Sequence, residues 1–460
     1  MGATNDFVSW ATAAGNNCMS QSAYLANPAQ QVGVQVGLAD PTLYNKATRQ
    51  ANFIAAALAQ FVANNQPNNV VDNGNQATFL AQLQLALNSA SSSAGMQTIT
   101  GAAHTFVAAD EGLFTFRSNT GTLMLDTLPG IGPGVLPAGI VRIENGDATA
   151  LYSVAVGSGA TLDGVAAGFI VLGPGQQCVV QSSGTNYYTL QKPARVRLAA
   201  NTSFYVDMAA GNDANEGLSA TTGAWKTLQA ADNWIAENVD FGGYVPTLQA
   251  TGAFTAGLYS KIPFFGGLGF TINFASGASV AAAVNTSAFV SDGSGTNLTV
   301  TSAGTQTVLS CTGTLPETGT IASVNGGHIV FSGVNFGASP TTDVFAAAFG
   351  ITTFNGAYTT SGGKNQHYLG NELGHIQAVA PPGGGTFVVT VTGTPAYSNA
   401  FAFINDNSLG TIPSSIVGYS GSATGVRAVV NDSSGLFTSG GANFFPGSSA
   451  VIDTNAYQYN

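Results

Sequence analysis

The sequence predicts a mainly β protein that begins with a small helical module and ends in a long stack of short strands. Only 7% of its 460 residues are charged, against about a quarter in ordinary soluble proteins. Glycine accounts for 59 residues, and short runs of Val, Thr and Phe alternate with Gly- and Asn-rich turns, a pattern typical of short strands. Three regions with different periodicity follow one another along the chain.

Residues 203–239 mark the beginning of the third region. Phe204-Tyr205-Val206 is aromatic and β-branched, as strands prefer, and residues 211–217 are rich in the Gly, Asn and Asp that turns require. An amphipathic helix is predicted next, because apolar residues recur at three- and four-residue steps: Trp225, Leu228, Ala231, Ile235 and Val239. Some 220 residues of short strands follow. We therefore expect this helix to cap the open end of a strand stack.

Residues 1–88 carry helical signals. Ser20 is a candidate N-cap for a short helix through Leu25, and Asp40-Pro41 is a strong start signal because proline is favoured at the first helical position. The helix that follows Asp40 is expected to end near residues 64–67, and another to begin near Asn75. So small a helical module has more apolar surface than it can bury alone. We expect it to pack against copies of itself or against another protein.

A linker and an all-β module are predicted next. Residues 89–97 contain the Ser-rich segment SASSSAG, a linker composition. From residue 98 to residue 195 the apolar pattern has period two, with strands expected at these segments: 113–116, 122–125, 140–143 and 178–180. We call this all-β module the neck.

Residues 200–460 are predicted to form a solenoid with the capping helix at its N-terminal end. Strands are expected at 270–274, 298–300, 329–331 and 387–391. Coils of roughly 22–28 residues give about ten coils. With strands about 4.8 Å apart, the stack would be roughly 45–50 Å long.

Charge and cysteine content narrow the classes of function. The net charge is −11, so no basic stripe is expected to bind nucleic acid. No run of about 18 apolar residues predicts membrane insertion, and the first residues do not resemble a secretory signal. Cys18, Cys178 and Cys311 match no zinc or disulfide spacing. We expect them to be buried free thiols in a protein made in a reducing compartment.

Three sets of short stretches carry a resemblance to a known family: Asn5-Asp6-Phe7 with residues 19–24 and 43–54; Tyr205-Val206-Asp207 with residues 211–213, 217–218 and 225–231; and residues 419–427 with 440–447. The first set resembles the virion-attachment module of tail fibres of tailed bacteriophages. The second resembles the beginning of a pectate-lyase-like right-handed β-helix, and the third resembles the closing segment of phage tail proteins with that solenoid, as in tail fibre and tailspike proteins.

This resemblance implies a homotrimer in the virion tail, made in the host cytoplasm. Residues 1–88 would dock on a tail or baseplate protein, and the β-helix of residues 200–460 would face the host. The implied function is adhesion to a host surface polysaccharide. Two alternatives stay open, namely a polysaccharide depolymerase (a glycosidase or lyase) on the β-helix and a purely architectural tail connector.

No catalytic, cofactor-binding or metal-binding residue is assigned from the sequence, although several patterns are suggestive. Asp213, Asn215 and Glu216 are acidic and amide side chains in a turn but lack the glutamate of an EF-hand loop, so a plain turn is expected. Asp292, Glu317, Asp343 and Glu372 recur at intervals close to the length of one coil. If they stacked on successive coils, a neighbouring pair would suit a retaining glycosidase. Corner positions in turns are the preferred interpretation.

Histidine and aromatic residues give weaker signals. His367 and His375 bracket Glu372, but the spacing is not that of a zinc protease helix, and a pair of loop histidines is expected. Trp225 is predicted to lie in the core, and Trp234 to be partly exposed or at a subunit contact. Four tyrosines of the distal half suit polar contact with carbohydrate: Tyr358, Tyr368, Tyr397 and Tyr419. The net charge of residues 196–460 is 5 basic minus 13 acidic, or −8, which disfavours a strongly anionic glycan.

Overall fold

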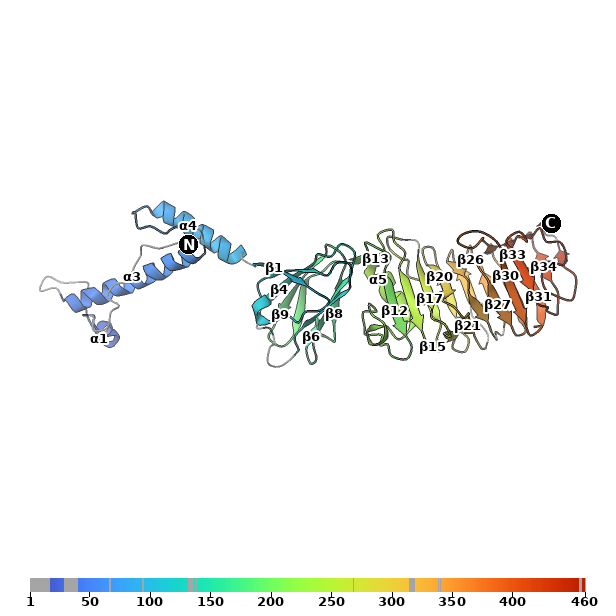
Figure 1. Ribbon diagram of the computed structural model, residues 1–460, viewed down its shortest axis with the longest axis horizontal. Coiled ribbons are helices and arrows are strands. Elements are labelled where there is room, and N and C mark those ends of the chain that lie inside the picture. Colours follow the sequence, from blue (N-terminus) through green and yellow to red (C-terminus); the bar gives the residue numbers. More distant parts are fainter. Residues whose placement is uncertain are drawn as a thin grey trace. The chain divides into compact units, whose positions relative to one another are not determined.

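The fold is mainly β, with a few helices near the N-terminus and one more at the start of the strand stack (Figure 1). The structure, a computed structural model, describes residues 17–28, 40–65, 68–92, 95–130, 136, 139–267, 269–313, 319–337, 339, 341–454 and 457–459. Asn5-Asp6-Phe7 lies outside these residues. The chain divides into two compact units. One comprises residues 1–97 with 112–114, and the other comprises residues 98–111 with 115–460.

The first unit is helical, and its helices begin where the capping signals predicted. The Ser20 side chain accepts a hydrogen bond from the Ala23 amide at 3.2 Å, and Asp40 Oδ1 accepts one from the Thr42 amide at 2.8 Å. Helix α4 continues to Ser92, into the Ser-rich segment predicted as a linker. The helices of this unit are α1 (Gln21–Leu25), α3 (Pro41–Asn64) and α4 (Gln76–Ser92).

The second unit begins with a β module that contains a seven-stranded and a three-stranded sheet among the described residues. The strand orders are β1-β2-β4-β9-β10-β6-β7 and β3-β5-β8, with a 3-10 helix, η1 (Ala108–Asp110), before β2. The bounds are as follows: β1 (Met96–Thr100), β2 (Phe114–Ser118), β3 (Met124–Leu128), β4 (Ile140–Asn145), β5 (Tyr152–Val156), β6 (Thr161–Leu162), β7 (Val165–Ala166), β8 (Phe169–Leu172), β9 (Gln177–Ser182) and β10 (Tyr187–Gln191).

A buried ion pair lies in this β module. The Arg117 guanidinium donates to both carboxylate oxygens of Asp126, at 2.6 and 2.8 Å, and both side chains are fully buried. The Tyr152 hydroxyl donates to the same carboxylate at 2.8 Å, and Arg117 also donates to the Gly101 carbonyl. Because a buried charge without partners is very unfavourable, these contacts make the three side chains depend on one another.

The rest of the second unit is a stack of parallel strands in three sheets, which the chain visits in turn. In the described residues the first sheet has ten strands: β12 (Ser203–Asp207), β14 (Thr247–Thr251), β17 (Phe270–Phe274), β20 (Asn297–Ser302), β23 (His328–Phe331), β26 (Ile351–Phe354), β29 (His375–Ala378), β32 (Leu409–Thr411), β35 (Gly435–Phe437) and β37 (Tyr457–Tyr459).

The second and third sheets have seven and eight strands in the described part of the chain. The second contains β15 (Ala253–Phe254), β18 (Ser279–Ala281), β21 (Thr307–Ser310), β24 (Val334–Phe336), β27 (Tyr358–Ser361), β30 (Phe387–Thr392) and β33 (Val417–Ser420). The third contains β16 (Leu258–Ser260), β19 (Phe289–Asp292), β22 (Ile321–Val324), β25 (Thr342–Ala346), β28 (Lys364–Gly370), β31 (Tyr397–Ile404), β34 (Ala428–Asn431) and β36 (Ile452–Thr454).

Each strand of the stack pairs in parallel with the strand one coil earlier. The ten strands of the first sheet agree with the predicted number of coils, but coil length varies more than predicted. Phe437 pairs with Tyr459 across a short coil, whereas Gln377 pairs with Thr411 across a coil that is half as long again. The stacked parallel sheets are compatible with a β-helix.

Helix α5 (Leu228–Asn238) follows the 3-10 helix η2 (Thr221–Gly223) and buries Leu228, Ala231 and Ile235 beside the first strands of the stack. Trp225, predicted on the same helix face, instead lies before the helix in a β-bridge with Val206 and is 1% exposed. The Thr227 hydroxyl caps the helix by accepting from the Ala230 amide, and Asp213 Oδ1 accepts from the amides of Lys226 and Thr227. The acidic turn therefore stabilises the start of the capping helix.

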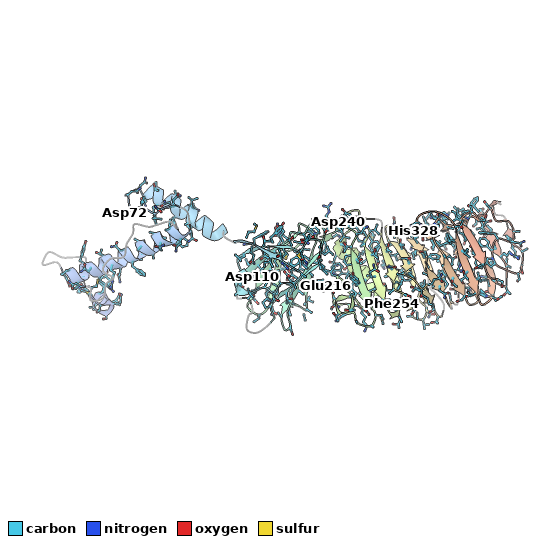
Figure 2. All side chains as sticks on the ribbon, viewed as in Figure 1. Asp72, Asp110, Glu216, Asp240, Phe254 and His328 are labelled. Carbon is cyan, nitrogen blue, oxygen red and sulfur yellow. The ribbon has the colours of Figure 1, made fainter. Side chains whose placement is uncertain are left out.

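The β module has a hydrophobic core of its own, but its residues Leu151 and Val171 belong to the core of the stack. Strand β11 (Val196–Arg197) pairs with β13 (Val239–Asp240), and Arg195 donates to the Ala236 carbonyl at the end of α5. Inside the stack, side chains from all three sheets meet, and Phe254, labelled in Figure 2, is one of them. No helix in the described parts of the chain is both long and apolar enough to cross a membrane.

Candidate functional site

A groove of about 280 Å³ lies where α5 meets the first coils of the stack. Its apolar lining comes from β16, β19 and the segments before them, and its polar lining comes from one side chain of α5 and three of the segment before β19. The lining residues are Gln229, Ala256, Gly257, Leu258, Tyr259, Ala283, Asn285, Thr286, Ser287 and Val290. A concave apolar surface with a few convergent polar groups is the usual form of a small-ligand site.

Gln229 fixes one wall of this groove. Its side-chain amide donates to the Tyr259 carbonyl at 3.0 Å and accepts from the Tyr259 amide at 2.8 Å. Strand β16 is the first strand of the eight-stranded sheet, so its outer edge offers unpaired backbone groups. The Gln229 amide bonds to that edge as a neighbouring strand would, and thereby holds Tyr259 in position.

Tyr259 belongs to a polar row that crosses three consecutive coils. Its hydroxyl donates to Asp292 Oδ2 at 2.5 Å, and Asn325 Nδ2 donates to Asp292 Oδ1 at 2.7 Å. Asp292 ends β19 and Asn325 lies in the turn after β22, where its φ of 53° is left-handed, a conformation that asparagine tolerates. Two fixed donors therefore orient a half-buried carboxylate beside the groove.

Ser287 is an unusual member of the lining. The residue is 7% exposed, and its hydroxyl has no hydrogen-bond partner within the part of the chain that the structure describes. A buried hydroxyl without a partner is unfavourable by about 1–3 kcal/mol. A ligand hydroxyl in the groove would supply the missing hydrogen bond.

The groove combines the features that complement a saccharide. Tyr259, 38% exposed, offers an amphipathic ring, while Gln229, Asn285, Thr286 and Ser287 supply amide and hydroxyl groups. Such groups both donate and accept hydrogen bonds, as sugar hydroxyls do. The arrangement can bind a sugar residue, and among the described residues no group of three or more His, Cys, Asp or Glu side chains is placed to hold a metal ion.

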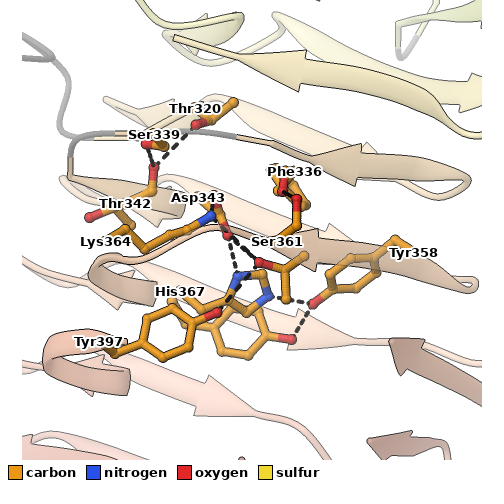
Figure 3. A network of polar contacts seen from close by, with 12 residues as sticks. Thr320, Phe336, Ser339, Thr342, Asp343, Tyr358, Ser361, Lys364, His367 and Tyr397 are labelled. Carbon is orange, nitrogen blue, oxygen red and sulfur yellow. Dashed lines mark hydrogen bonds and ion pairs between the residues drawn. The ribbon is translucent and has the colours of Figure 1, made fainter. Parts of the chain in front are cut away.

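A second polar cluster lies inside the stack (Figure 3). Asp343 of β25 accepts hydrogen bonds from Lys364 Nζ at 2.5 Å and from His367 Nδ1 at 2.6 Å, both on β28. Because a carboxylate only accepts, Nδ1 of His367 carries the hydrogen, and Nε2 accepts from the Tyr358 hydroxyl at 2.9 Å. The Tyr358 hydroxyl also contacts that of Tyr368.

Burial and charge set the protonation of this cluster. Burial raises the pKa of Asp343, but the positive charge of Lys364 and the hydrogen bond from His367 outweigh it and hold that pKa below its usual value. Burial lowers the pKa of His367, which keeps the imidazole neutral. Asp343 and His367 are 0% exposed and Lys364 is 5% exposed. A solute therefore does not reach the cluster, and its role is to connect β25, β27 and β28.

Of the four carboxylates considered for stacking, the three that the structure describes do not form a column. Asp292 ends β19 on the surface, Asp343 is buried in β25, and Glu372 lies in an exposed turn with a left-handed φ of 48°. Glu317 lies outside the described residues. The corner interpretation is confirmed for Glu372, and it is wrong for Asp343 because Lys364 and His367 hold that carboxylate inside the stack.

A different set of carboxylates does follow the coils. Glu372, Asp406 and Asp432 have φ of 48°, 52° and 50° in equivalent turns. The Leu373 amide bonds to the Asp406 carbonyl, and the Asn407 amide to the Asp432 carbonyl, which places the turns on successive coils. This column is not visible in the sequence because its two spacings are unequal and the first is longer than the predicted coil.

The histidines and tyrosines correct further expectations. The sequence places His367 and His375 in a loop, but they lie in strands β28 and β29 of different sheets, and His375 Nε2 contacts Thr411 Oγ1 at 3.1 Å. The tyrosines suited to carbohydrate contact face the interior instead: Tyr358, Tyr368 and Tyr397 are at most 3% exposed, and Tyr419 is half-buried against the core.

The remaining candidates agree with the structure more closely. Asn215 Nδ2 donates to the carbonyls of Thr222 and Ala224, so the acidic stretch is a plain turn. Trp225 is buried, and Trp234 is half-buried with its ring centroid 5.3 Å from that of Trp225. Cys178 and Cys311 are buried free thiols, but Cys18 is only half-buried.

The groove residues do not stand out in the sequence. Tyr259, Asp292 and Asn325 are 33 residues apart in each step, which is longer than the predicted coil. Comparison with protein-family models, with curated proteins and with solved structures finds no match. Function is therefore inferred from the groove and from the fold of this chain.

Proposed function

We propose that this chain is a structural protein of a bacteriophage tail, a fibre or tailspike, which adheres to a polysaccharide on the bacterial surface. In this proposal residues 200–460 form a right-handed parallel β-helix that faces the host. The visible support is the stack of parallel strands in three sheets, each strand paired one coil earlier. A right-handed course is the expected one, because parallel crossover connections are right-handed in about 98% of cases.

The observation that carries the proposal is the groove beside α5. The groove offers an exposed tyrosine ring and a buried hydroxyl without a partner among the described residues, and a carboxylate oriented by two donors lies beside it. These groups suit a sugar with several hydroxyls better than a hydrophobic or planar ligand. Asp292 at the groove and the net charge of −8 over residues 196–460, 5 basic minus 13 acidic, favour a neutral sugar over an anionic one.

The proposal includes a homotrimer in the virion tail, with residues 1–88 docked on a tail or baseplate protein. Support comes from the apolar side chains that the helical unit leaves exposed, such as Tyr44 at 66% and Phe53 at 64%. Exposed apolar surface of this kind usually marks a protein contact. Symmetric association is the commonest way for identical chains to cover it.

Binding of the full chain to an array of purified bacterial capsular polysaccharides and lipopolysaccharides tests the proposal. We expect one or a few glycans to bind, and Tyr259→Ala to weaken that binding roughly ten-fold or more. Tyr244→Ala is the matched control, because Tyr244 is 39% exposed and lies outside the groove. If Tyr259→Ala and Tyr244→Ala bound the glycan equally well, the groove would not be the glycan-binding site.

The same incubations address the alternative functions. New reducing ends or unsaturated sugars in the bound glycan would indicate a depolymerase, and the column of Glu372, Asp406 and Asp432 would then be the first set of carboxylates to substitute. Absence of binding across the array, together with a stable complex with a second tail protein at the distal end of the stack, would favour the architectural connector.

A further inference from the structure

Helix α3 exposes a regular apolar stripe. Its members alternate at steps of three and four residues, the spacing of the a and d positions in a coiled-coil heptad. Three of the larger side chains are well exposed, with Tyr44 at 66%, Ile54 at 68% and Leu58 at 38%. We call this set the α3 seam, and its residues are Tyr44, Ala47, Ala51, Ile54, Leu58 and Phe61.

The α3 seam meets the face of α3 that packs inside the helical unit only at its C-terminal end. Ala59, Val62 and Ala63 are buried with Val70 and with Ala86 of α4 in a small core. Of the seam residues, only Phe61 packs against this core among the described residues. Packing among the described residues of one helical unit therefore does not explain the other five positions.

We propose that the α3 seam is a contact between copies of this chain, arranged as a parallel coiled coil. The proposal rests on the proposed homotrimer and names the surface through which the helical units join. A heptad stripe requires a partner helix of the same period, since each knob fits a hole between side chains of the facing helix. A second copy supplies that period, with Ile54 facing Ile54 across the axis.

The positions beside the seam allow identical helices to approach. The flanking e and g positions carry uncharged residues: Leu43, Thr48, Gln50, Ala55, Ala57 and Val62, of which Val62 is buried in the core of the helical unit. Lys46 and Arg49 lie at the c and f positions, away from the partner helix in this register. No like charges would therefore face one another across the contact.

The length of the seam is consistent with a contact that needs support from the rest of the chain. From Tyr44 to Phe61 the helix rises about 26 Å, at about 1.5 Å per residue. Two and a half heptads are too few to hold free helices together in water. Chains already joined elsewhere have a high effective concentration, which makes so short a contact sufficient.

Cysteine cross-linking of the full chain tests the α3 seam, with two neighbouring residues as a matched pair. Ile54 lies in the seam, whereas Phe53 is as exposed, at 64% against 68%, but points about 100° away around the helix. Each would be changed to Cys in a Cys18→Ser background, in which the two remaining cysteines are buried. Mild oxidation and a denaturing gel then measure the fraction of chains linked in pairs.

We expect Ile54→Cys to link at least roughly ten times more chains than Phe53→Cys, because only the seam brings identical positions together. Ala51→Cys, also in the α3 seam, should link a similar fraction of chains. This second variant keeps the test valid if Ile54→Cys does not fold. If light scattering shows a trimer but Ile54→Cys and Phe53→Cys link equal fractions of chains, the α3 seam is not the contact between copies. The exposed stripe would then be a contact for a different protein. A monomer in light scattering would overturn the homotrimer as well.

Discussion

The carboxylate of Asp343 and the imidazole of His367 lie 2.6 Å apart in the interior of the strand stack, and both side chains are fully buried. They come from strands of consecutive coils, β25 and β28. Lys364 completes the charge balance with an Nζ–Oδ1 distance of 2.5 Å. A core made mainly of phenylalanine and aliphatic side chains thus contains one negative and one positive charge.

Removal of the lysine charge should destabilise the fold by more than the loss of the Lys364 hydrogen bonds alone would. Lys364→Met leaves the Asp343 carboxylate buried with no cation beside it among the described residues, and such a change typically destabilises by about 3–5 kcal/mol. We expect a clear fall in the denaturant midpoint of unfolding. Lys226→Met, at an exposed lysine, is the control and should change little.

A double variant measures how strongly the charges of Asp343 and Lys364 are coupled. Asp343→Asn combined with Lys364→Met removes both charges, so its loss of stability should be smaller than the sum of the two single losses. An additive result would contradict the coupling that the 2.5 Å contact implies.

Asp232 in α5 should make the stability of the cap depend on pH. Its carboxylate oxygens have no hydrogen-bond partner within the described residues, and burial, which outweighs a weak interaction with the Ser260 hydroxyl, raises its pKa from 3.8 to about 7. The folded state therefore holds the proton more tightly than the unfolded state. The stability that Asp232 contributes is complete below about pH 4 and is lost as the pH rises to about 7. The loss is at most about 4 kcal/mol.

Asp232→Asn removes this titration, so the variant should gain stability over the wild type as the pH rises from 4 to 8. Melting temperatures measured across this range provide the test. Three histidines with lowered pKa, His328, His367 and His375, destabilise the fold below about pH 6.5, but they are common to both proteins. A difference between variant and wild type that does not change with pH would contradict the prediction.

Local periodicity made much of the fold predictable. The stripe from Trp225 to Val239 is spaced as one helix face and is buried, and its middle residues Leu228, Ala231 and Ile235 lie in α5, whereas Trp225 and Val239 lie just outside the helix. Phe270–Phe274 alternates apolar and polar residues, and it is strand β17 with alternating burial. These predictions succeeded because the signal lies within a few neighbouring residues and does not depend on the rest of the chain.

Contacts between coils were not predictable in the same way. Coil length is not constant along the paired strands, so a fixed period does not identify which residues stack. A corner was the preferred interpretation for Asp343 because the sequence does not show Lys364 beside it, 21 residues later. Tyr358 and Tyr368 were expected at the surface, but their hydroxyls find partners inside the core.

Gln229 should protect the edge of the first strand of the eight-stranded sheet. Gln229→Leu removes both hydrogen bonds to the Tyr259 backbone, each worth about 0.5–1.5 kcal/mol. We expect the Tyr259 amide to exchange with solvent deuterium roughly five-fold faster or more. Asn233→Ala is the control, since Asn233 is an exposed residue of α5 that bonds to Gln229 and not to the strand. Unchanged protection at Tyr259 would show that another group satisfies the edge.

The hydroxyl of Tyr152, which bonds to the buried Arg117–Asp126 pair of the β module, should contribute to the stability of the fold. Tyr152→Phe removes the hydroxyl that donates to Asp126 at 2.8 Å and leaves Arg117 in place. Hydrogen bonds to charged groups contribute about 1.5–3 kcal/mol, so the free energy of unfolding should fall by that amount. Tyr188→Phe, at a side chain 48% exposed in β10, should have little effect. If both variants unfolded at the same denaturant concentration as the wild type, the Arg117–Asp126 pair would not depend on Tyr152, because the guanidinium alone would satisfy the carboxylate.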